Sequence, residues 1–294
     1  MNPLENIFNS FRQGNSLIRL IFINVSLFVI LGFLEIILQL FKLPSAFLWS
    51  YLSLPADLTR LIYQLWTPIS YMFLHEGFMH LLFNMLSLYW FGKLFIIYFS
   101  EKQLVGLYLL GGLIGAFFYL SAFNVFPYYH PILSQSLLLG ASGSIMAIIV
   151  ASATQSPNME MQMLFVGGVK LKYIALVAVL MSFFGITSNN GGGQLAHLGG
   201  ALAGYYFVVS LRQGRDLTKA INNLLGFVVD IFRAKKLKAK PNNSRKAPMS
   251  DAEYNVNKAN KMANIDRILD KIKTSGYESL SADEKKKLFE QGSK

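Results

Sequence analysis

The feature that most constrains this chain is the scarcity of charge in its first 211 residues. They hold 8 Lys/Arg and 6 Asp/Glu residues, whereas residues 212–294 hold 19 and 10. Apolar residues make up 53% of the chain and charged residues 15%, against about 25% charged residues in soluble domains. This distribution is typical of a membrane protein whose apolar body is followed by a basic, water-soluble tail.

The apolar body has room for about six membrane-spanning helices, because an acyl-chain core about 30 Å thick needs about 20 residues per helix. Backbone groups facing lipid must bond to one another, so we expect an all-α membrane protein, a six-transmembrane-helix bundle. The fourth and fifth predicted spans have 14 residues each, which suits helices that begin below the membrane surface. The six spans are Leu17–Phe41, Gly77–Phe99, Gln103–Phe123, Ser142–Gln155, Tyr173–Ile186 and Gln194–Leu211.

Charge and hydropathy also divide the chain into domains. Apolar residues recur at helical spacing from Ile265 to Ile272, and Ser281 followed by Glu284 indicates a capping box that opens a last short helix. We therefore expect a soluble, partly helical C-terminal tail. The predicted domains are a cytoplasmic N-terminal segment (1–16), the six-helix domain (17–211), an interfacial helix and basic linker (212–250) and a small cytoplasmic helical tail (251–294).

The charges between the spans predict the orientation. With the N-terminus in the cytoplasm, the outer segments carry only Lys42 and Arg60, and the inner ones carry every other Lys and Arg. This is the positive-inside pattern, so we expect both termini in the cytoplasm. The basic tail then lies near anionic lipid headgroups or cytosolic partners. No motif indicates nucleic-acid binding.

Four histidines are present: His75, His80, His130 and His197. On this topology all four fall in the outer half of the bundle or in its outer loops, where a polar side chain is a functional candidate. His75, Glu76 and His80 resemble a zinc motif with one residue too many. A spacing of five residues turns the two rings about 140° apart, which is poor geometry for one metal ion. We expect neither a metal nor a cofactor.

Ser142 falls in the first turn of the fourth span, within Gly140-Ala141-Ser142-Gly143. Backbone N–H groups there lack intrahelical partners, and the helix dipole favours negative charge. These donors are able to stabilise an oxyanion on a carbonyl that Ser142 attacks. The alternative is an ordinary helix start made of small residues, because so short a match is weak in a chain with 23 glycines.

His197 opens the sixth span from the same outer side. Small residues line one face of each of these two spans, and such ridges let helix backbones approach closely. Close approach would bring Ser142 and His197 within hydrogen-bonding reach, the minimum for a nucleophilic hydrolase. The alternative is a lone polar histidine satisfied by a neighbouring helix. The two ridges are Gly143, Ala147 and Ala151 in the fourth span and Ala196, Gly200 and Gly204 in the sixth.

His80 and Asn84 are four residues apart and share one face of the second span. If they point inward, they complete an oxyanion site with the backbone of Ser142; the alternative is hydrogen bonding that merely holds the bundle together. No carboxylate has a spacing that ties it to His197. We therefore expect a Ser–His dyad whose imidazole is oriented by packing.

Three motifs stand in the order His80-x-x-x-Asn84, Gly140-x-Ser142-Gly143 and Ala196-His197-x-x-Gly200-x-x-x-Gly204. Together they resemble the rhomboid intramembrane serine proteases over residues 17–211. The resemblance implies Ser142 as nucleophile, His197 as base and acid, and an oxyanion site formed by His80, Asn84 and the Ser142 N–H. It also implies cleavage of transmembrane helices near the outer membrane face, in a multi-pass protein of the bacterial inner membrane.

The chain departs from the family at Met146, where some members carry an aromatic residue that stacks on the catalytic histidine. Two other functions compete with proteolysis. A rhomboid-like protein can bind transmembrane helices without cutting them, but such relatives typically lack the serine, the histidine or both at the positions of Ser142 and His197. A channel or transporter would show charged or broken helices and repeated halves, which are not visible. The expected partners are transmembrane-helix substrates and the lipid bilayer.

Overall fold

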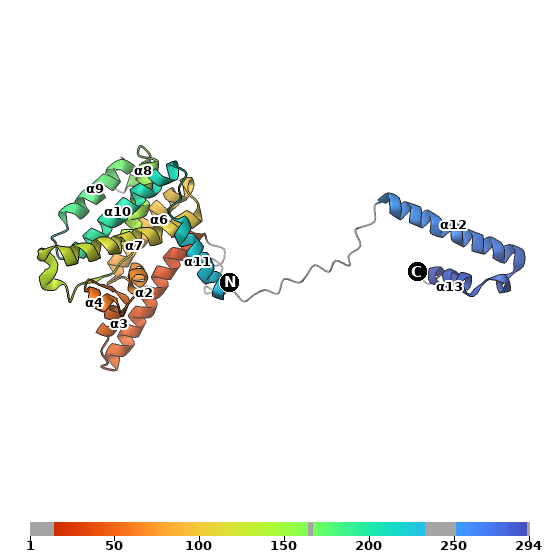
Figure 1. Ribbon diagram of the computed structural model, residues 1–294, viewed down its shortest axis with the longest axis horizontal. Coiled ribbons are helices and arrows are strands. Elements are labelled where there is room, and N and C mark those ends of the chain that lie inside the picture. The colour runs from red at the N-terminus through yellow and green to blue at the C-terminus, as the bar shows by residue number, and fades with distance from the viewer. Residues whose placement is uncertain (1–14, 164–166, 233–250, 293–294) are drawn as a thin grey trace. The chain divides into compact units, whose positions relative to one another are not determined.

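The computed structural model describes residues 15–163, 167–232 and 251–292. The chain forms two compact units, Met1–Arg233 and Ala234–Lys294, and Figure 1 shows that the first holds the apolar helices. The predicted basic linker and most of the predicted N-terminal segment lie outside the described residues.

The larger unit is built around six helices close to the six predicted spans, so the expectation of an all-helical bundle is confirmed. Three of them (Ser16–Leu40, Phe78–Tyr98 and Glu101–Val125) are long and apolar enough to cross a membrane, judged by length and composition, and two (Ser142–Gln155 and Leu171–Phe184) are shorter apolar helices. The six are α2 (Ser16–Leu40), α6 (Phe78–Tyr98), α7 (Glu101–Val125), α8 (Ser142–Gln155), α9 (Leu171–Phe184) and α10 (Gly191–Arg212).

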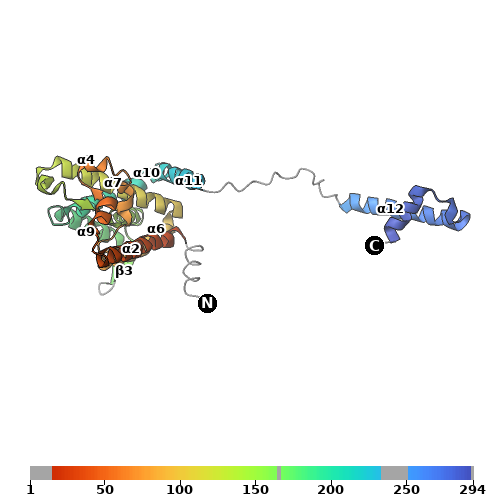
Figure 2. The same cartoon turned by 90° about the horizontal axis from the view of Figure 1, so that it is seen from below.

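Helix α8 lies at the centre of the bundle. Nine of its 14 residues are buried, and it packs against α6, α7, α9 and α10. Helix α10 lies between α9 on one side and α7 on the other (Figure 1). Helix α2 packs outside this group, against α6 and α7, and buries three of its 25 residues (Figure 2). A side chain on α8 is therefore surrounded by other helices on most sides.

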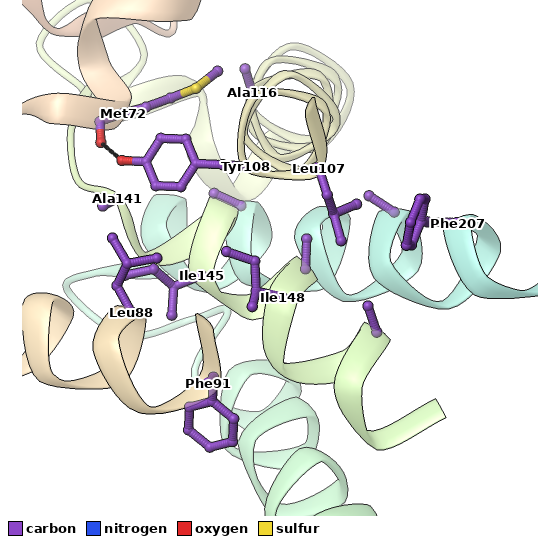
Figure 3. Packing of buried hydrophobic residues seen from close by; sticks show 14 of the residues in the cluster. Met72, Leu88, Phe91, Leu107, Tyr108, Ala116, Ala141, Ile145, Ile148 and Phe207 are labelled. Carbon is purple, nitrogen blue, oxygen red and sulfur yellow. Dashed lines mark hydrogen bonds between the residues drawn. The ribbon is translucent and has the colours of Figure 1, made fainter. Parts of the chain in front are cut away.

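A buried hydrogen-bond network joins the outer helix to the core. The Tyr108 hydroxyl on α7 donates to the carbonyl oxygen of Met72 at 2.8 Å (Figure 3). The side-chain amide of Asn24 on α2 donates to the same hydroxyl at 3.3 Å and to the carbonyl of Leu20 at 2.8 Å. Each polar group is thus satisfied among apolar neighbours, as burial requires. Leu88, Ile145 and Ile148 belong to the same buried hydrophobic cluster as Tyr108 and Met72 (Figure 3).

The connection before α6 folds into short pieces instead of hanging free. Strand β1 (Leu54–Pro55) pairs antiparallel with β2 (Leu137–Leu138), which ties this connection to the segment just before α8. Trp66 donates its indole N–H to the carbonyl of Tyr51 at 2.8 Å. The pieces are the helices α3 (Ala46–Leu52), α4 (Leu58–Leu61) and α5 (Thr67–Ser70) and the 3-10 helix η1 (Tyr71–Phe73); a second 3-10 helix, η2 (Pro127–Ile132), follows α7.

A two-stranded hairpin stands between α8 and α9, where sequence analysis predicted no strands. Strand β3 (Glu160–Met163) pairs antiparallel with β4 (Gly167–Lys170), and Glu160 lies opposite Lys170 (Figure 2). The run Glu-Met-Gln-Met alternates polar and apolar residues, the two-residue period of a strand. The run has only four residues and lies between two apolar spans, so its period is too short to recognise in the sequence.

Helix α11 (Lys219–Phe232) follows the bundle and packs against α7. Its start is held by Asp216, whose carboxylate accepts from the Gln103 side chain at 3.0 Å. The first residues of α7 are held in turn by a capping box, in which Ser100 Oγ accepts from the Gln103 N–H at 3.2 Å.

The smaller unit contains α12 (Asp251–Ser275), the 3-10 helix η3 (Tyr277–Ser279) and α13 (Ala282–Gly292). Ile268 and Leu280 are buried between these elements. The predicted capping box is formed, since the Ser281 N–H donates to the Glu284 carboxylate at 2.8 Å. That bond and the Lys271 ammonium at 2.9 Å lower the pKa of Glu284 to about 2.

The contact between α8 and α10 sets the tightest steric limit in the bundle. A Cβ atom added to Gly204 would fall on the carbonyl oxygen of Ala147, whereas one added to Gly32 in α2 would meet nothing within 4 Å. We predict that Gly204→Ala lowers the free energy of unfolding by about 1–3 kcal/mol, the cost of overpacking. Gly32→Ala, the matched control, should not destabilise, because alanine is the better helix former. Thermal melting in detergent compares them, and equal melting temperatures would contradict the close contact.

Candidate active site

Ser142 is the first residue of α8, and its side chain is half-buried. The preceding residue, Ala141, offers no side-chain cap to the N–H groups of the first turn. These donors also lack intrahelical partners, as in any helix start. The hydroxyl of Ser142 therefore lies beside free backbone donors at the positive end of a helix dipole.

Gly140 shapes the entry to α8. Its φ of +126° lies in the region that favours glycine, and its N–H donates to the carbonyl of Tyr71 at 2.9 Å. A Cβ atom there would lie 3.1 Å from Nε2 of His80 and 3.6 Å from Oγ of Ser142. The His80 ring and the Ser142 hydroxyl thus flank one point on the backbone, where only glycine leaves them room.

The helices α8 and α10 meet backbone to backbone at two levels. A Cβ atom on Gly200 would fall on the carbonyl oxygen of Gly143, and one on Gly204 on that of Ala147. At the first of these levels, a Cβ atom on Gly143 would also lie 3.2 Å from the carbonyl oxygen of Ala196. Gly143 and Ala196 are the sequence neighbours of Ser142 and His197. The contact therefore sets these two side chains at the same depth.

A second glycine contact, which sequence analysis missed, holds α10 against α7. A Cβ atom on Gly199 would lie 2.7 Å from the carbonyl oxygen of Ile114 and 2.8 Å from Cα of Gly115. One on Gly115 would lie 2.8 Å from the carbonyl oxygen of Ala196. Gly199 therefore contacts α7, whereas the adjacent Gly200 contacts α8. The two consecutive glycines in the sequence were the signal that could have predicted this second contact.

Asn84 and His80 lie on α6, on the side that faces the start of α8. The Asn84 amide donates to the carbonyl of His80 at 2.9 Å, and its side chain is 7% exposed. A primary amide has two N–H donors, so one remains for another acceptor. The His75 ring packs edge-on against the His80 ring, with centroids 5.1 Å apart. His130 lies in η2 and is exposed.

Within the described residues, no group of three or more His, Cys, Asp and Glu side chains is arranged to hold a metal ion. His75 and His80 do meet, but no carboxylate or third imidazole completes a ligand set with them. The described site thus consists of a hydroxyl, imidazoles, an amide and backbone donors.

In the described part of the chain, no hydrogen bond joins Ser142 to His197. Both side chains are half-buried, so they are enclosed but still accessible. The backbone contact brings their helices together, but the two side chains are not in contact through a hydrogen bond.

Ser182 on α9 is a site residue that sequence analysis did not find. Its Oγ lies 3.2 Å from Nδ1 of His197, and its side chain is 2% exposed. Sequence analysis expected packing to orient the imidazole, whereas the structure adds a hydrogen bond. A serine within an apolar helix gives no sign of its partner, because the partner depends on how α9 packs against α10.

Two family models match the chain. The Rhomboid domain matches residues 63–214, which include Ser142, His197, His80 and Asn84. Residues 250–294 match a family described as of unknown function, DUF6576. The chain is also similar to presenilin-associated rhomboid-like protein A, mitochondrial, of Danio rerio, with 29% identity over 160 residues. That match covers 52% of this chain and 38% of the fish protein, so the chain spans well under half of that relative.

Proposed function

The chain belongs to the rhomboid family, and from that premise we propose that it is an intramembrane serine endopeptidase acting through Ser142 and His197. The observation that carries the proposal is the backbone contact of α8 with α10, beside Gly143 and Gly200. A nucleophile and a base on two helices in direct backbone contact have little freedom to drift apart, and such positioning is a large part of catalysis.

The first step is attack on a peptide carbonyl. The Oγ of Ser142 forms a bond to the carbonyl carbon while the neutral imidazole of His197 takes the hydroxyl proton. The carbonyl oxygen becomes an oxyanion in a tetrahedral intermediate. His197 then gives the proton to the departing amine, which leaves an acyl ester on Ser142. A water molecule then gives a proton to His197 and attacks the ester carbonyl. The second tetrahedral intermediate breaks its bond to Oγ, His197 returns the proton to Ser142, and the carboxylic acid is released.

The oxyanion needs donors aimed at the place where charge develops. The N–H of Ser142 is one, because the first turn of α8 has no cap. The remaining amide hydrogen of Asn84 and the ring of His80 are the others, and the closeness of His80 to Ser142 across Gly140 supports this role. Donors fixed on two helices need little reorganisation during the reaction.

We propose transmembrane helices of membrane proteins as the substrate class. Its support is that the nucleophile starts a 14-residue helix, enclosed within an apolar bundle. Fourteen residues extend about 21 Å, less than the thickness of the acyl-chain core, so Ser142 lies below the membrane surface. A substrate helix must present an extended carbonyl at that depth, which favours cleavage near the outer face. Lipid surrounds both partners.

We also propose a bacterial inner membrane location, which rests on the family resemblance, with both termini in the cytoplasm. The distribution of Lys and Arg supports this orientation, because it leaves Lys42 and Arg60 as the only basic residues of the outer segments. Under this orientation Ser142 and His197 open towards the outer side, and the C-terminal unit lies in the cytoplasm.

The dyad is tested by Ser142→Ala and His197→Ala. Each should abolish cleavage of a transmembrane-helix substrate in proteoliposomes, because losing one half of a nucleophile–base pair costs nearly as much as losing both. Melting curves must show that both variants remain folded. Full activity in either folded variant would end the assignment. A wild-type protein that binds the substrate helix but never cuts it would favour the non-cleaving alternative.

The oxyanion role is tested by Asn84→Ala, which should lower kcat by about 10²–10³ with KM little changed. Asn124 on α7 is the matched control, because its amide also donates to the carbonyl four residues earlier, at 2.8 Å. Asn124→Ala should cost stability but leave kcat of the folded protein near wild type. A change in KM alone for Asn84→Ala would make Asn84 a binding or packing residue.

A further inference from the structure

We propose that Ser182 is a positioning residue that fixes the tautomer and orientation of the His197 imidazole. The proposal rests on the proposed protease function and deepens it by adding a third helix, α9, to the site. Within the described residues, the contact with Ser182 is the only hydrogen bond of the His197 side chain, and none of the described aromatic ring pairs includes His197. The serine is therefore the one directional contact on this ring.

A proton count gives the direction of the bond. A serine hydroxyl carries one hydrogen, and Ser182 Oγ donates it to the carbonyl oxygen of Ala178 at 2.9 Å. Towards Nδ1 of His197, at 3.2 Å, the hydroxyl has only a lone pair to offer. A carbonyl oxygen can only accept, whereas Nδ1 can donate or accept, so the arrangement that satisfies all three groups has the remaining hydrogen on Nδ1, and we assign it there. Ser182 thus holds the neutral imidazole as the Nδ1–H tautomer.

This tautomer leaves Nε2 unprotonated, and the base of the proposed mechanism needs one unprotonated ring nitrogen. With Nδ1 directed at α9, the basic nitrogen lies on the other side of the ring. When Ser142 gives up its proton, His197 becomes an imidazolium whose Nδ1–H still donates to Ser182. A hydrogen bond from a charged donor is stronger than a neutral one, so the bond gains strength as the charge forms. Ser182 on α9 thus accepts the hydrogen bond from Nδ1 that a carboxylate accepts in a Ser–His–Asp triad.

The competing explanation is that the Ser182 hydroxyl only forms a hydrogen bond within its own helix and has no effect on His197. Serines in apolar helices often bond to the carbonyl four residues earlier, as Ser182 does to Ala178. Ser152 on α8 is 1% exposed and donates to the carbonyl of Ile148 at 2.8 Å, and its hydroxyl has no second partner among the described residues. Ser182 differs in having an imidazole nitrogen on its other side. Ser152 is therefore a matched control.

The experiment compares Ser182→Ala, Ser182→Val and Ser182→Thr with Ser152→Ala, using steady-state cleavage of a transmembrane substrate in proteoliposomes. Valine and threonine have the same shape, so any packing disturbance is shared and only the hydroxyl differs. We expect Ser182→Ala and Ser182→Val to lower kcat by about 3- to 10-fold, the difference between a hydrogen bond from a charged donor and one from a neutral donor, with KM unchanged. Ser182→Thr should have a kcat 3- to 10-fold above that of Ser182→Val, and Ser152→Ala should match wild type.

Equal kcat values for Ser182→Thr and Ser182→Val would overturn the proposal, because the hydroxyl would then do nothing beyond filling space. Wild-type kcat in Ser182→Ala, or an equal loss in Ser152→Ala, would also overturn it. These results leave a Ser142-dependent protease in place. Failure of the proposed function looks different: wild-type protein would show no cleavage that Ser142→Ala removes.

Discussion

The direct backbone contact between α8 and α10 is the constraint on which the rest of the site depends. The carbonyl oxygens of Gly143 and Ala147 occupy the space where side chains on Gly200 and Gly204 would begin. In a membrane, where lipid is as apolar as the helices, such contacts hold helices together by packing rather than by the hydrophobic effect. No flexible side chain lies between the two backbones at this contact, so the backbones themselves set the distance between α8 and α10. Ser142 and His197, each one residue away from the contact, therefore have little freedom to move apart.

Helix α10 is held from three sides, and each side serves a different purpose. The α8 side carries Ser142, and the α7 side fixes the position of α10 through Gly199 and Gly115. The α9 side contributes Ser182, which contacts the imidazole itself. Side chains on packed helices are positioned more precisely than side chains on loops, because a helix in a packed bundle has few alternative positions. The short strands β1 and β2 extend this support to the segment just before α8.

Sequence alone predicted the features that repeat along the chain or lie close together in it. Hydropathy placed the six helices to within a few residues, and the spacing of Gly200 and Gly204 predicted the ridge that meets α8. Ser182 was not predictable, because an apolar helix with one serine looks the same whether or not a histidine faces it. The β3–β4 hairpin was missed because its four-residue strands are shorter than the window in which a period is recognised. The missing hydrogen bond between Ser142 and His197 depends on side-chain rotamers, which sequence patterns do not encode.

The proposed function requires that backbone contact between α8 and α10 makes Ser142 reactive. Labelling with a serine-directed fluorophosphonate, followed by peptide mass spectrometry, measures that reactivity. We predict a single adduct, on Ser142, in wild-type protein. We predict strongly reduced labelling in Gly200→Val, which keeps Ser142 and His197 but forces α10 away from the carbonyl of Gly143. An adduct on another serine, or wild-type labelling of Ser142 in Gly200→Val, would contradict the account.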